Sequence, residues 1–572
     1  PFPFEKVCIQ GDPWSTLIYN TTQQPVYDAI LDLSRRKGYG YELLPGKRLP
    51  AAAYADDGAL IGASVSQTQD IFNLFEIGIE WMRGEVSSPK SVAVAWRRFD
   101  GKERGRKALA NHYYDCFDPD IKFRGSSIPF MGDTPFKYLG ALIPPRPNMA
   151  LQKSIIENNL TEMLRKIDNC CLPDPAKVKV YRSGVPCRLN FPFTIYPLEA
   201  AWASRNLDPI CLSYFRKWLH MPTSANAGVL VLNATMSIKL PLPSILLAQA
   251  QNKRVQMLSK SSDPWAPLLV ANDKYAVRPI KFKRAASPIK HHVSKSCIYD
   301  KADEKLRARI SELSTQGRLS GITELAEQDA EWAKMAWGLP CGLLKFLVNA
   351  TGNTLPTADN LVRWKKIKSA CCKLCNGTQT IVHVLGSCPV ALKQDRFTWR
   401  HDSILSTLID VLKGSQTLRS WSLIWDDPDN QEPYILPPIF PSSCLLRPDG
   451  IFYNSISKEV VLVELSAGCE ENTDEAHARK EEKYAELCAF AISKGWTCIQ
   501  YSVEVGARGR LSNDLTKLLH FAKLTSEECK SCRKALRLTA ISCSYIIWLY
   551  RNDPNWPRRP LLRPSPAELT SK

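Results

Sequence analysis

The chain has 572 residues, with 75 Lys and Arg against 57 Asp and Glu, which gives a formal net charge of +18. This length predicts several domains, and the positive charge favours polyanionic partners. No apolar run reaches the roughly 18 residues that a membrane span needs. The chain contains 19 cysteines and does not open with a signal peptide, which favours a reduced intracellular setting over a secreted disulfide framework.

The first segment to predict structure is a Gly-Asp-Pro turn that leads into a helix reaching about Leu33. Residues 49–62 predict a hairpin whose tip carries Asp56 and Asp57 between apolar flanks. Adjacent aspartates in such a place are costly unless they are exposed or bind metal. A tight hairpin presents both carboxylates together, as two-metal phosphoryl transfer requires.

An amphipathic helix is predicted from Thr68 to Met82, because apolar residues recur there on one face. Lys90 follows in a Ser-Pro-Lys-Ser segment, just before a predicted strand at residues 92–96. Another hairpin is predicted at Phe136-Lys137-Tyr138-Leu139-Gly140.

Four motifs in this order resemble the palm of a reverse transcriptase of the non-LTR retrotransposon type: Gln-Gly-x-Pro-x-Ser, Tyr-Ala-Asp-Asp, Pro-Lys-Ser and Tyr-Leu-Gly. The resemblance implies that Asp56 and Asp57 bind Mg²⁺ and that Lys90 donates a proton to pyrophosphate. It also implies a template- and primer-binding set, which comprises Gln10, Gly11, Pro13, Ser15, Tyr138, Leu139 and Gly140. The family's first metal-binding aspartate and its fingers lie upstream of Gln10, so we expect a fragment whose polymerase is incomplete.

Residues 151–250 show a helical, Leu-rich and basic pattern, which resembles the thumb of the same elements. A basic, Pro-punctuated linker follows, with Arg278–Arg284 and then Lys290–His292. Such a linker could contact a phosphate backbone without reading bases. A solvated loop explains the same residues equally well.

Cysteine and histidine residues then follow the pattern C-x2-C-x7-H-x4-C, formed by Cys372, Cys375, His383 and Cys388. Three thiolates and an imidazole at this spacing close a tetrahedral Zn²⁺ site with no open position, so the predicted role is structural. Unpaired cysteines in a core are the alternative. The pattern resembles the zinc knuckle that lies between polymerase and endonuclease in these retrotransposons, and basic residues follow it here too, including Arg396 and the Arg400-His401-Asp402 run.

A second predicted hairpin pairs the segment around Asp449 with the apolar, β-branched run that ends at Glu464. The hairpin brings the two carboxylates to one edge of a sheet, where they stay ionised with a cation between them. Mg²⁺ prefers such oxygen ligands. The next segment predicts a helix with Lys480, Lys483 and Tyr484 on one face.

The Pro448-Asp449 pair and Glu464 resemble the PD…(D/E)xK motif of restriction-like endonucleases. Ser466 stands where the simple motif has lysine, so Lys480 or Lys483 would supply it from the helix. That displaced lysine resembles the endonuclease of site-specific non-LTR retrotransposons and implies catalytic roles for both acids, the lysines and Tyr484. A surface turn, a core strand and a solvated helix form the plainer alternative.

A strand at residues 496–505 is followed by a turn of the kind this endonuclease family keeps, from which Arg508 could reach a phosphate. Helices are predicted at residues 513–523 and 529–551. The pair Cys529 and Cys532 is expected to pack in the core, and the Pro- and Arg-rich tail from Asn552 is expected to be disordered.

Together these patterns predict a multidomain α/β protein. Its expected parts are a partial reverse-transcriptase palm (α+β, 1–145), a helical thumb (146–260), a basic linker with helices (261–355), a zinc-knuckle region (356–410), a PD-(D/E)xK-like α/β nuclease (411–525) and a C-terminal helix with a tail (526–572).

The resemblance implies target-primed reverse transcription, in which the nuclease nicks DNA with Mg²⁺ and the exposed 3′ hydroxyl primes RNA-directed DNA synthesis. The implied partners are the element's RNA, target double-stranded DNA and dNTPs, with no membrane, and the implied location is the nucleus. Alternatives are a catalytically inactive nucleic-acid-binding relic and a protein that acts as a nuclease alone. The oligomeric state is left open.

Overall fold

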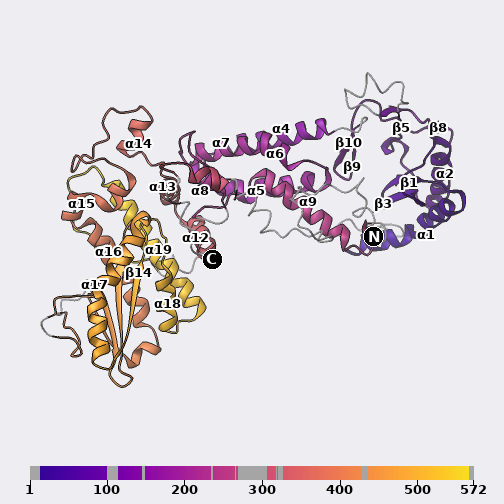
Figure 1. Cartoon of the computed structure of the whole chain (residues 1–572). Helices are drawn as coiled ribbons and strands as arrows, with labels where there is room; N and C mark the ends of the chain where they lie inside the picture. Colours follow the sequence, from indigo (N-terminus) through magenta and orange to yellow (C-terminus); the bar gives the residue numbers. More distant parts are fainter. Residues whose placement is uncertain are drawn as a thin grey trace, which may run out of the picture. The chain divides into compact units, whose positions relative to one another are not determined.

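The computed structural model (Figure 1) describes residues 13–98, 114–144, 149–232, 236–263, 266–267, 304, 306–316, 319, 326–427, 434–441 and 444–565. The protein is mixed α/β, with many helices and small sheets. The chain divides into two compact units, Pro1–Ile156 and Glu157–Lys572. No described helix combines the length and apolar character needed to cross a membrane.

The described residues of the first unit form two long helices and five separate two-stranded sheets. Helix α1 is Pro13–Lys37 and helix α2 is Val65–Trp81. The hairpins are β1 (Tyr41–Leu44) with β2 (Lys47–Leu49), β3 (Ala51–Tyr54) with β4 (Asp57–Leu60), β5 (Ala95–Arg98) with β6 (Tyr114–Phe117), β7 (Lys122–Phe123) with β8 (Ser126–Ser127), and β9 (Phe136–Tyr138) with β10 (Ala141–Ile143).

Helix α2 begins where Ser64 accepts a hydrogen bond from the backbone N–H of Gln67, which is a favourable N-cap. Its apolar stripe then packs on α1, and Ile71 joins Val26 and Ile30 in a buried cluster. The predicted helix at 68–82 and the hairpins around Asp56 and Tyr138 are confirmed.

The second unit begins with a group of helices, which confirms the helical pattern predicted for residues 151–250. They are α4 (Ala150–Asp168, which starts in the first unit), α5 (Asp174–Ile195), α6 (Ala200–Asn206), α7 (Asp208–Trp218), α8 (Gly228–Val231) and α9 (Pro243–Ser259). Buried aromatic residues contact one another in the core of this group: Tyr181 packs edge-on against Phe215, which in turn contacts Trp218. The Trp218 indole N–H donates to Asp168 at 2.9 Å, so its one polar atom is satisfied.

Further helices lead towards the C-terminal sheet. They are α12 (Ala326–Gly338), α13 (Cys341–Thr351), α14 (Ala358–Arg363), the π-helical turn η3 (His383–Ser387), α15 (Pro389–Lys393) and α16 (Arg396–Lys413). Short 3-10 turns occur at η1 (Ser88–Lys90), η4 (Thr417–Ser420) and η5 (Glu470–Asn472).

A four-stranded sheet carries the order β11-β12-β13-β14. Its strands are β11 (Ser422–Trp425), β12 (Gly450–Asn454), β13 (Glu459–Ser466) and β14 (Thr497–Glu504). The first three strands are antiparallel, whereas β13 and β14 are parallel and are joined by α17 (Thr473–Ser493). The hairpin at Asp449 and Glu464 and the helix after it were predicted, and both are confirmed.

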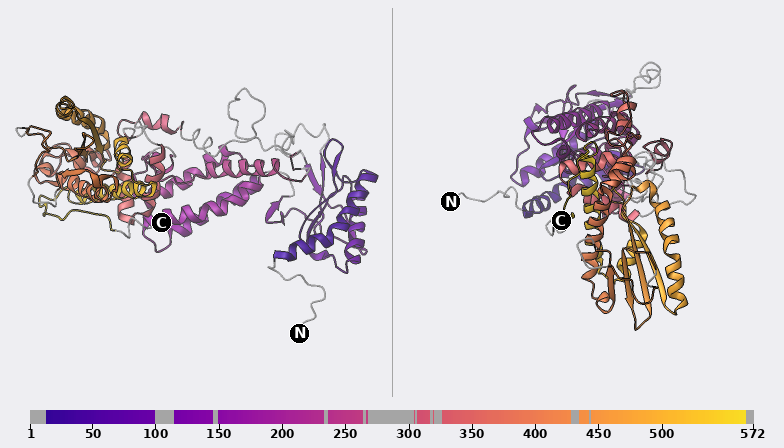
Figure 2. Two further views of the ribbon diagram at one scale, coloured as in Figure 1. Left: turned by 90° about the horizontal axis from the view of Figure 1, so that it is seen from below. Right: turned by 90° about the vertical axis from the view of Figure 1, so that its left-hand side faces the viewer.

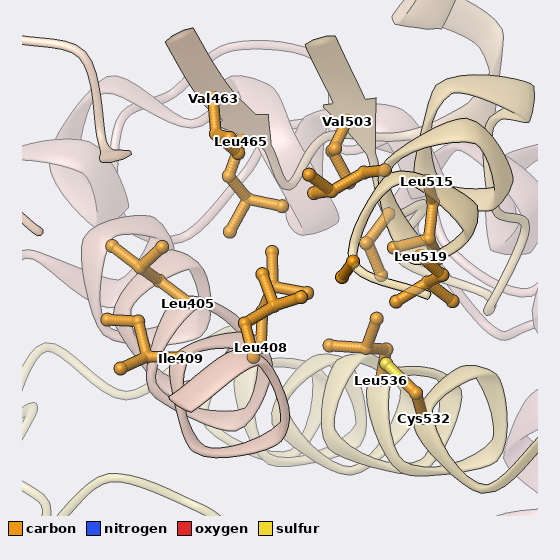
Figure 3. Packing of buried hydrophobic residues seen from close by; sticks show 14 of the residues in the cluster. Leu405, Leu408, Ile409, Val463, Leu465, Val503, Leu515, Leu519, Cys532 and Leu536 are labelled. Carbon is orange, nitrogen blue, oxygen red and sulfur yellow. The ribbon is translucent and has the colours of Figure 1, made fainter. Parts of the chain in front are cut away.

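Helices cover both faces of this sheet (Figure 2). On one face, alternate strand residues such as Val463, Leu465 and Val503 pack against α16, α18 (Asn513–Phe521) and α19 (Ser526–Leu549), as Figure 3 shows. On the other face, Leu462 and its neighbours pack against α17. Because side chains alternate along a strand, residues 460, 462 and 464 all point towards α17.

The tail after α19 lies along α16, contrary to our prediction of disorder from Asn552. The Arg396 guanidinium donates to the backbone oxygens of Tyr550 and Asp553, at 2.7 and 2.6 Å. The Trp399 indole N–H donates to Pro560 O at 3.0 Å. Polar and aromatic side chains of α16 thus hold a segment whose composition alone indicated a free chain.

Candidate functional site

Two carboxylates meet at the end of the β12–β13 ladder. Gly450 pairs with Val463, so Asp449 and Glu464 lie opposite each other one step further along. The Asp449 N–H donates to Glu464 Oε2 at 3.2 Å, and the Leu465 N–H donates to Asp449 Oδ2 at 2.6 Å. Both residues are buried, with 9% and 3% of their surface exposed. The backbone therefore fixes both acids in one place.

Helix α17 adds positively charged groups to these acids. The Lys480 ammonium contacts Glu464 Oε1, and the Lys483 ammonium lies 3.8 Å from the same oxygen. Lys483 also donates to the Tyr484 hydroxyl at 2.6 Å, and that hydroxyl donates to Arg447 O at 2.9 Å. Tyr484 is fully buried. It thus ties α17 to the segment that leads into Asp449, and the three predicted helix residues are brought to the acids together.

His401 completes the cluster from α16, and we did not assign it this role from the sequence. Its Nε2 lies 3.4 Å from Asp449 Oδ2, and its Nδ1 lies 3.1 Å from Asp402 Oδ1. Burial opposes protonation, but the Asp402 and Asp449 carboxylates raise the pKa of His401 to about 10. The imidazole is therefore a cation at neutral pH. The Arg-His-Asp run after the cysteine motif was the available signal, although it did not indicate which group the ring would face.

The neighbouring Arg400 anchors α16 beside the sheet. Its guanidinium is almost wholly buried and donates to Ala467 O at 2.6 Å, just beyond the end of β13. The helix that carries His401 is thereby held against the strand that carries Glu464.

The four predicted metal ligands also come together. One ligand atom from each of Cys372, Cys375, His383 and Cys388 lies within 4.8 Å of every other, so the cluster could hold a metal such as zinc. Cys372 and Cys388 are buried. Burial lowers the pKa of His383, which favours the neutral imidazole that binds metal.

Local backbone geometry explains this convergence. Asn376 adopts a left-handed conformation with φ of 62°, and its N–H donates to Cys372 O at 2.9 Å, which closes the turn between the first two ligands. Asn tolerates this conformation better than most residues. The turn η3 then presents His383, whose Nε2 lies 3.3 Å from Cys375 Sγ.

The first unit holds the remaining carboxylate pair. Asp56 and Asp57 are exposed at the tip of the β3–β4 hairpin, where Ala55 has a positive φ of 51°. The Tyr138 hydroxyl donates to Asp57 O at 3.4 Å, so the structure brings these two motifs together. Leu139 and Gly140 form the turn beside Tyr138, with φ of 48° and 80°.

Lys90 is exposed at the end of η1, and within the described part of the chain it forms no ion pair or hydrogen bond with either aspartate. Pro13 and Ser15 belong to the first turns of α1, whereas Gln10 and Gly11 lie outside the described residues. The basic linker predicted at Arg278–Arg284 and Lys290–His292 also lies outside them.

Arg508 does not reach the surface, contrary to our prediction that it could contact a phosphate. Its side chain is fully buried, and its Nη1 lies 3.1 Å from Glu470 Oε2 and 2.9 Å from Glu471 Oε2. Burial opposes the charge, but Glu471 and Glu470 raise the pKa of Arg508 above its usual value. Two acids of η5 thus pair with the Arg508 guanidinium, so Arg508 has a structural role.

Comparison with known proteins adds no relative to this description. No protein-family model matches the chain, and no curated protein matches it.

Proposed function

We propose that this chain is part of a non-LTR retrotransposon reverse transcriptase and endonuclease, and that its C-terminal α/β part nicks DNA with Mg²⁺. The observation that carries the proposal is the pairing of Asp449 and Glu464 across β12 and β13, with Lys480 contacting Glu464 from α17. Two adjacent carboxylates supply the oxygen ligands that Mg²⁺ prefers, and a lysine beside them can offset charge on a phosphate, which suits metal-assisted phosphodiester hydrolysis.

Each residue then has a chemical role. Asp449 and Glu464 would hold the Mg²⁺, which when bound polarises the scissile phosphate and activates water. The Lys480 ammonium, now paired with Glu464, is placed to orient the attacking water or to offset charge on the phosphate. The Tyr484 hydroxyl positions the backbone at Arg447, two residues before Asp449. His401 holds the Asp449 carboxylate in place.

The other two clusters fit the same proposal. The four Cys and His side chains would bind Zn²⁺ and stabilise the fold between the helical part and the sheet. The exposed carboxylates of Asp56 and Asp57 are open to Mg²⁺ and to incoming dNTPs, which supports a polymerase role for the first unit. The proposed partners are the element's RNA and target double-stranded DNA, and the proposed location is the nucleus.

The test is nicking of supercoiled DNA by the full chain, with and without Mg²⁺. We expect the parent to convert supercoiled into open-circular DNA and an Asp449→Ala, Glu464→Ala double variant to do so at least ~10³-fold more slowly. A Glu459→Ala variant is the matched control, because Glu459 lies on β13 at the opposite end of the ladder.

DNA binding is measured in parallel by fluorescence anisotropy. If the double variant still binds DNA but no longer nicks it, both acids act in the reaction itself. If neither parent nor variants nick although all bind DNA, the nucleic-acid-binding relic replaces the proposal. Equal nicking by parent and double variant would move the reaction elsewhere in the chain.

A further inference from the structure

A pair of cysteine thiols bridges α17 and β14 outside the Cys and His cluster. Cys488 lies on α17 and Cys498 on β14, and the two Sγ atoms are 3.1 Å apart. Both residues are only partly buried. A disulfide needs about 2.05 Å between the sulfurs, so the two sulfur atoms must move closer together for the bond to form.

The two thiols are chemically unequal. Cys498 donates its S–H to Cys488 Sγ, and this hydrogen bond lowers the pKa of Cys488 while it raises that of Cys498. The thiolate is the attacking species in thiol–disulfide exchange. This order of pKa values would make Cys488 the attacking thiol of the pair and Cys498 the resolving thiol.

A hydrogen-bond relay links this pair to the turn of α17 that carries Lys480. The Cys488 thiol contacts Gln500 Oε1 at 3.9 Å, and the Gln500 side-chain N–H donates to Lys480 O at 3.0 Å. Loss of the Cys488 S–H removes a donor to Gln500. Oxidation of the thiols would thus alter the hydrogen bonding of Gln500, which contacts the backbone carbonyl of Lys480.

We propose that Cys488 and Cys498 form a reversible disulfide that ties α17 to β14, with a low-molecular-weight disulfide such as oxidised glutathione as the oxidant. The Cys488 thiolate attacks one glutathione sulfur and releases one glutathione thiolate. The Cys498 thiolate then attacks the Cys488 sulfur of the mixed disulfide and releases the second. Two electrons pass to glutathione, and the two thiol protons of the protein end on the two released thiols.

The test is peptide mapping of the zinc-loaded full chain after equilibration in glutathione buffers, with rapid alkylation of the remaining thiols. Trypsin cuts after Lys483, Lys494 and Arg508, so each cysteine lies in its own fragment, 484–494 or 495–508. We expect one cross-linked product, two hydrogen masses lighter than the summed fragments, in more than about half of the chains under oxidising buffer. Dithiothreitol should abolish it.

Two variants sharpen the result. Cys498→Ser should leave a stable glutathione adduct on Cys488, because no resolving thiol remains. Cys444→Ser is the matched control, as Cys444 is also partly buried beside this sheet, and it should leave the cross-link unchanged. Hydrogen exchange of the 484–494 backbone should slow by about threefold or more in the oxidised parent.

Recovery of both cysteines alkylated in the parent under fully oxidising buffer would overturn the proposal. A glutathione adduct on the parent without a cross-link would overturn it too. Neither readout depends on DNA nicking, so the outcome is independent of the proposed nuclease function.

Discussion

Lys480 on α17 contacts Glu464 Oε1 directly, whereas Lys483 approaches the same oxygen only to 3.8 Å and donates instead to the Tyr484 hydroxyl. Lys480 is also the less exposed of the two, at 24% against 41% of its side chain. The sequence left both lysines open as partners of the acids. Under the proposed nuclease function, this geometry favours Lys480 as the lysine that would act at the phosphate and Lys483 as the one that supports Tyr484.

Lys480→Ala should therefore reduce Mg²⁺-dependent nicking by about 10²-fold or more, the scale for loss of one positioned charge or proton-transfer group. Lys483→Ala should cost only about tenfold on the same scale. The measurement is the initial rate on supercoiled DNA at saturating Mg²⁺. Arg479→Ala is the control, since Arg479 precedes Lys480 on the helix and is exposed. A larger loss in the Lys483 variant would reverse the ranking.

The cysteine cluster predicts about one zinc per chain for the parent, by the structural-site rule. Cys375→Ser should bind zinc weakly and release it to a chelator, because three ligands leave the tetrahedral site open. Cys371→Ser is the control, since Cys371 is the exposed neighbour outside the ligand set. Metal content is read by elemental analysis after dialysis. Zinc retained equally by both variants would exclude this ligand set.

Much of the site was predictable because it follows from local chain pattern. The β-branched run from Val460 predicted a buried strand, and hairpin closure then placed Asp449 beside Glu464. The spacing of Lys480 and Tyr484 predicted their shared helix face. The short ligand spacing from Cys372 likewise predicted a compact cluster, because few backbone paths join residues so close in sequence.

What failed depends on packing between distant segments. The prediction that Arg508 could reach a phosphate fails because the composition of its turn gives no sign of burial, yet Glu470 and Glu471 of η5 pair with Arg508 inside the fold. His401 lies 48 residues before Asp449 in the chain, and no local pattern shows that α16 would bring the two together. The prediction of a disordered tail fails for the same reason, since the residues that contact the tail, Arg396 and Trp399, lie far upstream in the chain.

The tail supports a stability prediction. A chain that ends at Arg551 loses the Asp553 and Pro560 acceptors, which leaves the buried Arg396 short of one hydrogen bond and the Trp399 N–H without its partner. Each unmet buried group costs about 1–3 kcal/mol, so the free energy of unfolding should fall by a few kcal/mol in urea titration. A chain that ends at Ser565 keeps both contacts and should match the parent. Equal stability of the two truncated chains would contradict the packing seen here.

An ion pair between α12 and α19 predicts a pH dependence of stability. The Glu331 carboxylate accepts hydrogen bonds from Arg533 and Arg537, and Arg537 is almost wholly buried. Burial acts to raise the pKa of the Glu331 carboxyl, but the two guanidinium groups outweigh burial and lower this pKa. A carboxylate whose pKa is lowered by folding stabilises the protein above its unfolded pKa of about 4.3. That stabilisation disappears as the pH falls through the folded pKa.

Glu331→Gln should therefore lower the free energy of unfolding at pH 7 by about 1–3 kcal/mol, since the charged contact of Glu331 with the buried Arg537 is lost. The difference from the parent should shrink steadily below pH 4.3 or so. Denaturant titrations from pH 7 to pH 3 measure it. Glu527→Gln is the control, because Glu527 pairs with Lys530 on the same α19 but is 86% exposed, and exposed pairs contribute little. If the difference in unfolding free energy between the parent and Glu331→Gln stays constant from pH 7 to pH 3, the carboxylate charge is not what joins the two helices.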